Sequence, residues 1–97
     1  MLMDYHHRWG YVFLAFDSFI TFDERIYLAR EAIEMKLNGI STRDIKRDGY
    51  EGKLYEKGGY QTLGTFSGQC FEAELETDRG KSNLSFLVTE HIRATLN

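Results

Sequence analysis

The chain has 97 residues, of which 42% are hydrophobic and 28% are charged, and its formal net charge is −3. This length and composition predict one globular domain covering residues 1–97 and exclude intrinsic disorder. The negative charge disfavours a general nucleic-acid binder, because nonspecific affinity comes mostly from lysine and arginine on phosphates. The single cysteine, Cys70, excludes an intramolecular disulfide and a cysteine-based zinc cluster.

The N-terminal residues 1–19 lack the features of a signal peptide. Their apolar run is short, is interrupted by Gly10 and Asp17, and is preceded by Asp4 rather than by a basic cluster. No stretch of the chain approaches the roughly 20 apolar residues of a membrane span. We therefore expect a cytoplasmic protein that does not associate with membranes.

The first predicted element is a strand at residues 8–16, RWGYVFLAF. This segment is apolar at both alternating sets of positions and is rich in aromatic and β-branched residues. Such a pattern is typical of a strand covered on both faces. It predicts a central position in the sheet.

The second predicted element is a helix within residues 21–39. Thr21 followed by Glu24 forms a capping box, and Gly39 is a natural residue just beyond the C-terminus. A stripe at helical spacing is expected to face the core. Its members are Phe22, Ile26, Ala29, Ile33 and Leu37.

The remaining chain predicts a short helical turn, three strands and a last helix. The turn occupies residues 41–49 and ends at Gly49. The strands form an antiparallel meander with turns at Gly58-Gly59 and at Ser67-Gly68. Residues 82–97 keep helical spacing, although residues 82–89 also alternate as a strand would. The expected fold class is thus α+β: an N-terminal strand and a three-stranded meander form a sheet that packs against the long helix and a C-terminal helix.

Three glutamates alternate with apolar residues in QCFEAELETD, residues 69–78. Residues two apart on a strand share one face and lie about 6.6 Å from each other. The alternation predicts that the apolar members face the core and the acidic members face solvent. The apolar members are Phe71, Ala73 and Leu75, and the acidic members are Glu72, Glu74 and Glu76.

Two interpretations of this acidic row stay open: a solvated strand face, or a docking site for a basic protein surface. Like charges in such a row repel each other, and Lys53, Lys57 and Arg79 are candidate internal partners that would relieve the repulsion. The spacing resembles that of backbone phosphates, so the docking interpretation predicts a partner such as a nucleic-acid-binding complex. The predicted partner-binding residues are Glu72, Glu74, Glu76 and Asp78.

Catalysis is not predicted from these residues. A pair of catalytic carboxylates needs a cleft and one acid with a raised pKa, whereas three exposed acids on a flat strand provide neither. Hard cations prefer converging oxygen ligands from a loop. Cys70 has no histidine near it in sequence and is expected to be a small buried apolar residue. We expect no enzyme activity, no metal and no cofactor.

A second functional hypothesis comes from residues 35–49, MKLNGISTRDIKRDG, which resemble the turn of a helix-turn-helix. The hairpin at residues 52–64 would then be a wing. Two features disfavour this hypothesis: Met35 replaces the usual small residue, and the second helix would end after about two turns. The residues that would face DNA are Thr42, Arg43, Lys46 and Arg47.

The favoured hypothesis is a non-enzymatic protein-interaction module that docks through its acidic strand face. A short, proline-free chain with this charge pattern suits an inhibitor from a phage or mobile element that acts on a nucleic-acid-binding host defence complex. The alternative is the small DNA-binding regulator just described. Both are compatible with a homodimer that pairs an exposed edge strand of the meander across a two-fold axis.

Overall fold

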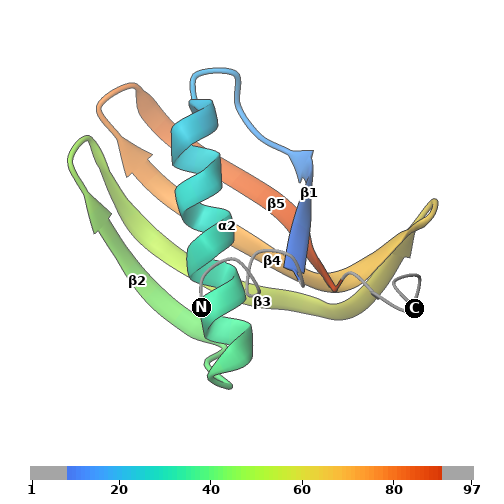
Figure 1. Ribbon diagram of the computed structural model, residues 1–97. Helices are drawn as coiled ribbons and strands as arrows, with labels where there is room; N and C mark the ends of the chain where they lie inside the picture. The colour runs from blue at the N-terminus through green and yellow to red at the C-terminus, as the bar shows by residue number, and fades with distance from the viewer. Residues whose placement is uncertain (1–8, 91–97) are drawn as a thin grey trace.

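A computed structural model describes residues 9–90, and within this range five strands form a single antiparallel sheet (Figure 1). The strand order is β1-β5-β4-β3-β2. The helix α2 lies across one face of this sheet (Figure 1). The elements are β1 (Trp9–Ala15), α2 (Phe22–Leu37), β2 (Thr42–Arg47), β3 (Tyr50–Leu63), β4 (Phe66–Thr77) and β5 (Gly80–Glu90).

The predicted helix and both of its ends are confirmed. The backbone N–H of Thr21 donates to Glu24 Oε1 at 2.7 Å, and the backbone N–H of Glu24 donates to Thr21 Oγ1 at 3.2 Å. At the other end, Gly39 has a φ of 68°, and the backbone N–H of Ile40 donates to the carbonyl of Met35 at 2.9 Å. These local contacts satisfy backbone groups that a helix end leaves without partners.

The buried side of α2 differs in part from the predicted stripe. Phe22 and Leu37, at the two ends, are 62% and 47% exposed. The two ends of the helix therefore carry apolar side chains that stay exposed, although Met35 near the C-terminal end is fully buried. The buried residues of the helix are Leu28, Ala29, Ala32, Ile33 and Met35.

The hydrophobic core lies between α2 and the sheet. At its centre, Phe86 of β5 is fully buried and stacks on Phe13 of β1 and Phe71 of β4, with ring centroids 4.6 Å and 6.1 Å apart. The core also includes Ile20, Ile45, Tyr50, Leu54, Ala73, Leu75, Leu84 and Val88, together with the buried residues of α2. Aromatic pairs of this kind contribute beyond the area they bury, so this stack couples three neighbouring strands.

The expected C-terminal helix is wrong, because residues 80–90 form β5, an interior strand between β1 and β4. β5 pairs with β4 from Gly80 to Thr89 and with β1 on its other side. The alternating residues Leu84, Phe86 and Val88 are all fully buried. Residues 91–97, which belonged to the same prediction, lie outside the described residues. The fold is therefore a five-stranded antiparallel sheet with one helix across residues 9–90, rather than the expected α+β fold in which an N-terminal strand and a three-stranded meander pack against two helices.

The expected short helix at residues 41–49 is also wrong. Residues 42–47 form β2, which pairs with the start of β3 through a tight turn at residues 48–49. Gly49 adopts a φ of 95°, a conformation that glycine accepts without strain. This glycine connects the two strands of a hairpin and does not end a helix.

The two expected hairpin breaks lie inside strands. β3 continues past Gly58 and Gly59, whose φ values of 81° and 74° accompany a bulge between residues 56 and 60. The turn between β3 and β4 instead contains Gly64, with a φ of 63°. Gly68 lies within β4. The predicted meander thus has two long strands where three short ones were expected in residues 50–77.

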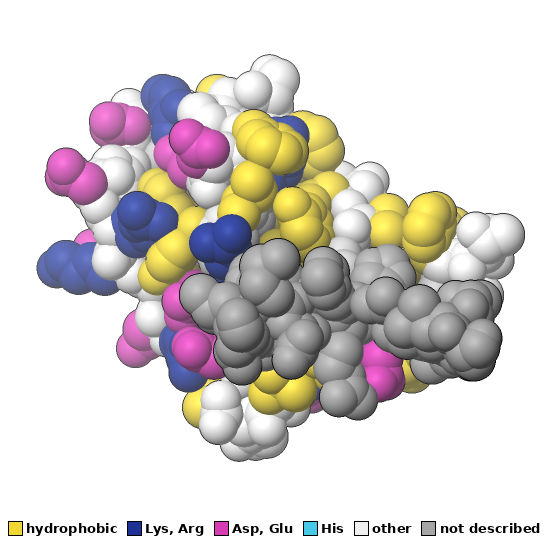
Figure 2. Space-filling model, viewed as in Figure 1, with side chains coloured by type: hydrophobic (Ala, Val, Ile, Leu, Met, Phe, Trp, Pro, Cys, Tyr) yellow, Lys and Arg dark blue, Asp and Glu magenta, His cyan; other side chains and the backbone are white. Residues whose placement is uncertain are grey.

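β1 lies at an edge of the sheet, whereas the sequence predicted a central strand. Its described partner is β5 alone. Phe13 packs against the core, but Tyr11 and Leu14 are each 37% exposed. Figure 2 shows hydrophobic side chains gathered over β1 and the start of α2. The apolar character of this strand therefore reflects an exposed apolar edge as well as a buried face.

Candidate functional site

The sheet face opposite α2 carries the acidic row and is called the open face here. Directly opposed residues in antiparallel strands share one face, so the pairing of β4 with its neighbours assigns each side chain. Phe71, Ala73 and Leu75 are at most 3% exposed and pack under the helix. Glu72, Glu74 and Glu76 lie on the open face, as the alternation predicted.

Glu72 is the most engaged of the three glutamates. Lys57 forms an ion pair with it, with Nζ 2.9 Å from Oε1, and the Tyr55 hydroxyl lies 2.9 Å from the same oxygen. The hydrogen bond from Lys57 is the main cause that lowers the pKa of Glu72, against the opposing effect of partial burial. Glu72 is therefore ionised and neutralised within the molecule at neutral pH.

Tyr55 links Glu72 to Glu74. Its hydroxyl lies 2.8 Å from Glu74 Oε2, so its single proton is shared between two carboxylates. The hydrogen bond to Glu74 is the largest cause that raises the pKa of Tyr55, because an ionised phenol would face two negative charges. The neutral Tyr55 side chain thus bridges Glu72 and Glu74 by hydrogen bonds but does not neutralise their negative charges.

Glu51 and Glu76 face each other directly across β3 and β4. Lys46 Nζ lies 3.9 Å from Glu51, and Lys81 Nζ lies 3.5 Å from Glu76. The two lysine side chains are 87% and 85% exposed, and ion pairs of this kind contribute about 0–1 kcal/mol. Like charges directly opposite each other on a sheet are unfavourable. Each glutamate at this end of the open face therefore has one exposed, weakly held lysine beside it, and the repulsion between the two carboxylates is only partly offset.

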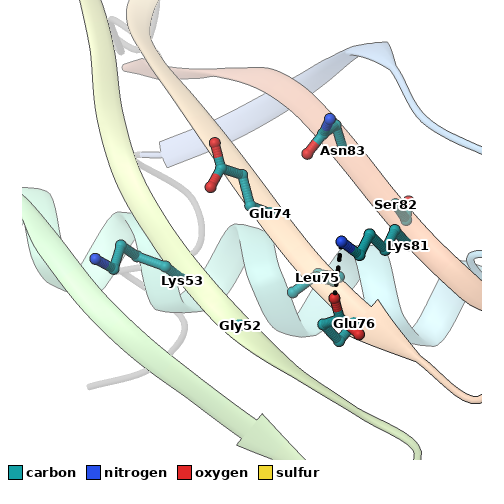
Figure 3. A pocket seen from close by; sticks show the side chains of 8 residues that line it. All are labelled: Gly52, Lys53, Glu74, Leu75, Glu76, Lys81, Ser82 and Asn83. Carbon is teal, nitrogen blue, oxygen red and sulfur yellow. Dashed lines mark ion pairs between the residues drawn. The ribbon is translucent and has the colours of Figure 1, made fainter.

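A shallow depression of about 470 Å³ lies beside these carboxylates (Figure 3). Glu74 and Glu76 border it, and Lys81 reaches toward Glu76. Lys53 is opposite Glu74 in the strand register, but its side chain points away from that carboxylate (Figure 3). The other lining residues are Gly52, Leu75, Ser82 and Asn83. The depression has room for a side chain from outside, and its two carboxylates are accompanied by two lysines.

Asp78, the fourth predicted site residue, is not on the open face. It lies in the turn between β4 and β5, and its backbone N–H donates to the carbonyl of Gly49 at 3.3 Å. Arg79, an expected partner of the acidic row, instead donates to the Phe19 carbonyl at 2.7 Å and to Glu24 at 2.9 Å. The structure thus brings together three of the four predicted residues and assigns Arg79 to the start of α2.

The four residues of the DNA-binding alternative lie on the strand β2. Thr42 and Lys46 belong to the open face, because they oppose open-face residues of β3. Arg43 points to the helix side and pairs with Glu31 at 2.8 Å and Glu34 at 3.1 Å. Arg47 lies over the Tyr27 ring at 4.1 Å. These residues are divided between two faces, so they do not form the surface of a recognition helix.

The residues of this site that the sequence analysis did not identify lie mainly on β3. Glu51 and Tyr55 follow the same period of two as Lys53, which identifies them as neighbours on one face once β3 is known to be a strand. Lys57 was an expected partner, and the structure pairs it with Glu72. Lys81 was missed because its segment preceded a predicted helix.

Cys70 lies next to this site and is predicted to react slowly. The thiol is 6% exposed, and burial is the main cause that raises its pKa. Because the thiolate is the nucleophile, alkylation by iodoacetamide at pH 7 should be at least roughly tenfold slower in the folded protein than in urea. Mass spectrometry of the modified chain measures both rates. Equal rates would show that the thiol is accessible and would restore it as a candidate nucleophile.

Residues 9–90 contain no group of three or more histidine, cysteine, aspartate or glutamate side chains placed to hold a metal ion. In the same range, no helix combines the length and the apolar character needed to cross a membrane. No protein-family model matches this chain, and neither does any curated protein or solved structure. The chemistry of the open face is therefore the basis for a functional proposal.

Proposed function

We propose that this protein is a non-enzymatic interaction module that binds a basic protein surface on its open face. The observation that carries the proposal is the direct opposition of Glu51 and Glu76 beside Glu74. Carboxylates held in this way repel each other in the free protein. A cationic side chain from a partner, placed between the two carboxylates, would relieve that repulsion more fully than the exposed pairs with Lys46 and Lys81 do.

The charge of the open face favours a protein partner over nucleic acid. Phosphate would meet the carboxylates of Glu51, Glu74 and Glu76, and the lysines beside Glu51 and Glu76 are already paired with those carboxylates. Lys46 and Lys81 are long and exposed, so they can move aside when a partner docks. Charge of one sign at the rim of a binding surface mainly accelerates encounter and selects the partner.

The partner class that fits best is a protein with a basic groove that holds nucleic acid. Successive glutamates on β4 lie about 6.6 Å apart, a spacing close to that of backbone phosphates, so they can occupy positions that phosphates would take. A chain that fills such a groove competes with nucleic acid for it. The proposed activity is thus inhibition by occupation of the groove, with no chemical step.

Reversing two charges on the open face should abolish this binding. We expect the Glu74→Lys/Glu76→Lys variant to bind a deca-lysine peptide at least about tenfold more weakly than the unmodified chain, a change of about 1.4 kcal/mol. Fluorescence anisotropy of a labelled peptide at low and at physiological salt measures the affinity. Duplex DNA of 20 base pairs serves as the second probe and should not bind the unmodified chain.

The matched control is Asp17→Lys/Glu56→Lys, which changes the net charge by the same amount. Both residues are exposed, and Glu56 opposes Phe71, so it lies on the helix side of the sheet. This control should keep peptide affinity within about threefold, because only net charge and not the open face is altered. Equal losses in both variants, or tighter binding of DNA than of peptide, would contradict the proposal.

A further inference from the structure

The two edges of the sheet differ in how they are protected. β2, with the sequence TRDIKR, is short and carries a charge at four of its six positions. β1, with the sequence WGYVFLA, carries no charge. Natural proteins protect edge strands with charges, because an apolar edge offers its free backbone groups to another strand. By this criterion β2 is protected against pairing with another strand, whereas β1 is open to it.

An aromatic patch extends the apolar edge toward the start of α2 (Figure 2). The guanidinium of Arg25 lies 4.1 Å from the centre of the Phe16 ring and within 6 Å of the Phe13 and Phe22 rings. Phe16 and Phe22 are 43% and 62% exposed. Aromatic residues and arginine are the residue types that dominate the energetics of protein interfaces. The patch and the strand edge together form one continuous surface.

We propose that β1 pairs with β1 of a second copy of this chain, antiparallel across a two-fold axis at Val12. The two five-stranded sheets then form one continuous sheet, and the two aromatic patches meet beside it. This interface is separate from the open-face site proposed above. It also differs from the meander edge that the sequence suggested for a homodimer, because that edge is occupied by the charged strand β2.

The sequence of β1 is self-complementary in this register. Tyr11 opposes Phe13 of the second copy on the helix side, which forms an aromatic pair on each side of the axis. Val12 opposes itself. Cross-strand pairs of aromatic and β-branched residues are among the favourable ones in antiparallel sheets.

The charges on the chain permit a second copy as the partner of β1. A two-fold axis places identical residues near each other, so any charge on β1 would be opposed by its own copy. Residues 9–16 contain none, and the nearest charges in the chain are Arg8 and Asp17. The acidic row that contributes to the net charge of −3 lies on β4, which β5 separates from this edge. Two copies can thus bring their β1 edges together without placing like charges opposite each other.

Cysteine cross-linking tests the register. In a Cys70→Ala background, Val12→Cys places two thiols on opposed residues, whose Cα atoms lie about 4.5–5.5 Å apart in an antiparallel pair and within the range of a disulfide. Oxidised glutathione should convert most of this variant to a covalent dimer. The matched control, Asp44→Cys, occupies the middle of the other edge strand on the same face and should stay monomeric.

Sedimentation of the unmodified chain between roughly 10 and 500 µM measures the association itself, because edge pairing of modest area gives micromolar dimers. Val12→Lys opposes two ammonium groups and should shift the chain to monomer, with circular dichroism as the check that it folds. A monomeric unmodified chain at the highest concentration overturns the proposal. A dimer in which Asp44→Cys cross-links and Val12→Cys does not overturns it equally.

Discussion

Replacing Phe86 by alanine is expected to lower the free energy of unfolding by about 3–5 kcal/mol. Phe86 is fully buried, and its ring lies between those of Phe13 and Phe71, which belong to the two strands that flank β5. The substitution removes the apolar contacts of the ring and leaves a cavity that the sheet cannot close. A small domain has about 5–15 kcal/mol of stability in total, so this variant loses a large part of it.

Urea denaturation followed by circular dichroism measures this loss. A thermal melt should show a decrease of at least about 12 °C, since 1 kcal/mol corresponds to about 4–8 °C in a domain of this size. The matched control is Phe66→Ala, because Phe66 is 49% exposed at the start of β4 and should change stability by less than about 0.5 kcal/mol. Similar losses in the two variants would show that the central ring stack does not dominate the core.

The helix could be predicted because its signals are local. Thr21 and Glu24 lie three residues apart and contact each other directly, and Gly39 ends the helix by its own conformation. No knowledge of the sheet is needed for either end. The buried side of the helix was predicted less well, because helical spacing alone does not show that Phe22 and Leu37 at its two ends stay exposed.

The strand at residues 80–90 could not be distinguished from a helix by its pattern. Leu84, Phe86 and Val88 alternate as in a strand, but Leu87 on the opposite face is also buried, at 1% exposure. A strand buried on both faces reads as a continuous apolar run, for which helical and strand periods fit equally well. Only its pairing with β1 and β4 identifies it.

The edge position of β1 depends on a contact between distant residues. Trp9 pairs with Glu90, so the strand order follows from a register that joins the two ends of the described chain. That register cannot be predicted from the local sequence of either strand. An apolar edge also contradicts the usual protection of edges by charge, which is why composition pointed to the centre of the sheet.

For the candidate site, too, local features were predicted from the sequence and contacts between strands were not. The orientation of Glu72, Glu74 and Glu76 follows from the period of two within one strand and was predicted. The roles of Tyr55 and Glu51 depend on how β3 is aligned with β4, and the expected break at residues 58–59 concealed that alignment. Orientation within an element was therefore accessible from sequence, whereas the neutralising contacts across strands were not.

Gly68 illustrates that a glycine in a sequence can indicate either a turn or a close approach of two backbones. The sequence suggested a hairpin turn at residues 67–68, but Gly68 lies inside β4 and opposes Thr89. A Cβ atom there would overlap the carbonyl oxygen of Val88 and lie 2.7 Å from its carbonyl carbon. Glycine inside a strand often marks such a close approach of another backbone.

Gly68→Ala is therefore expected to lower the free energy of unfolding by about 2–3 kcal/mol. The atoms in the way belong to the backbone of β5, so no side-chain rotation can relieve the overlap. The two strands must separate at this point, and amide hydrogen exchange should accelerate at residues 87–89 of β5. Urea denaturation measures the stability, and hydrogen exchange followed by NMR locates the change.

The control that separates close approach from backbone conformation is Gly64→Ala. Gly64 has a φ of 63°, and a Cβ atom added there would have open space within 4 Å, so its substitution costs only the conformational strain of about 1–2 kcal/mol. That strain should leave exchange in β5 unchanged, because residues 87–89 pair with residues 68–70 of β4 and not with the turn at Gly64. If Gly68→Ala leaves exchange at residues 87–89 unaltered, the backbones of β4 and β5 do not approach each other closely at Gly68.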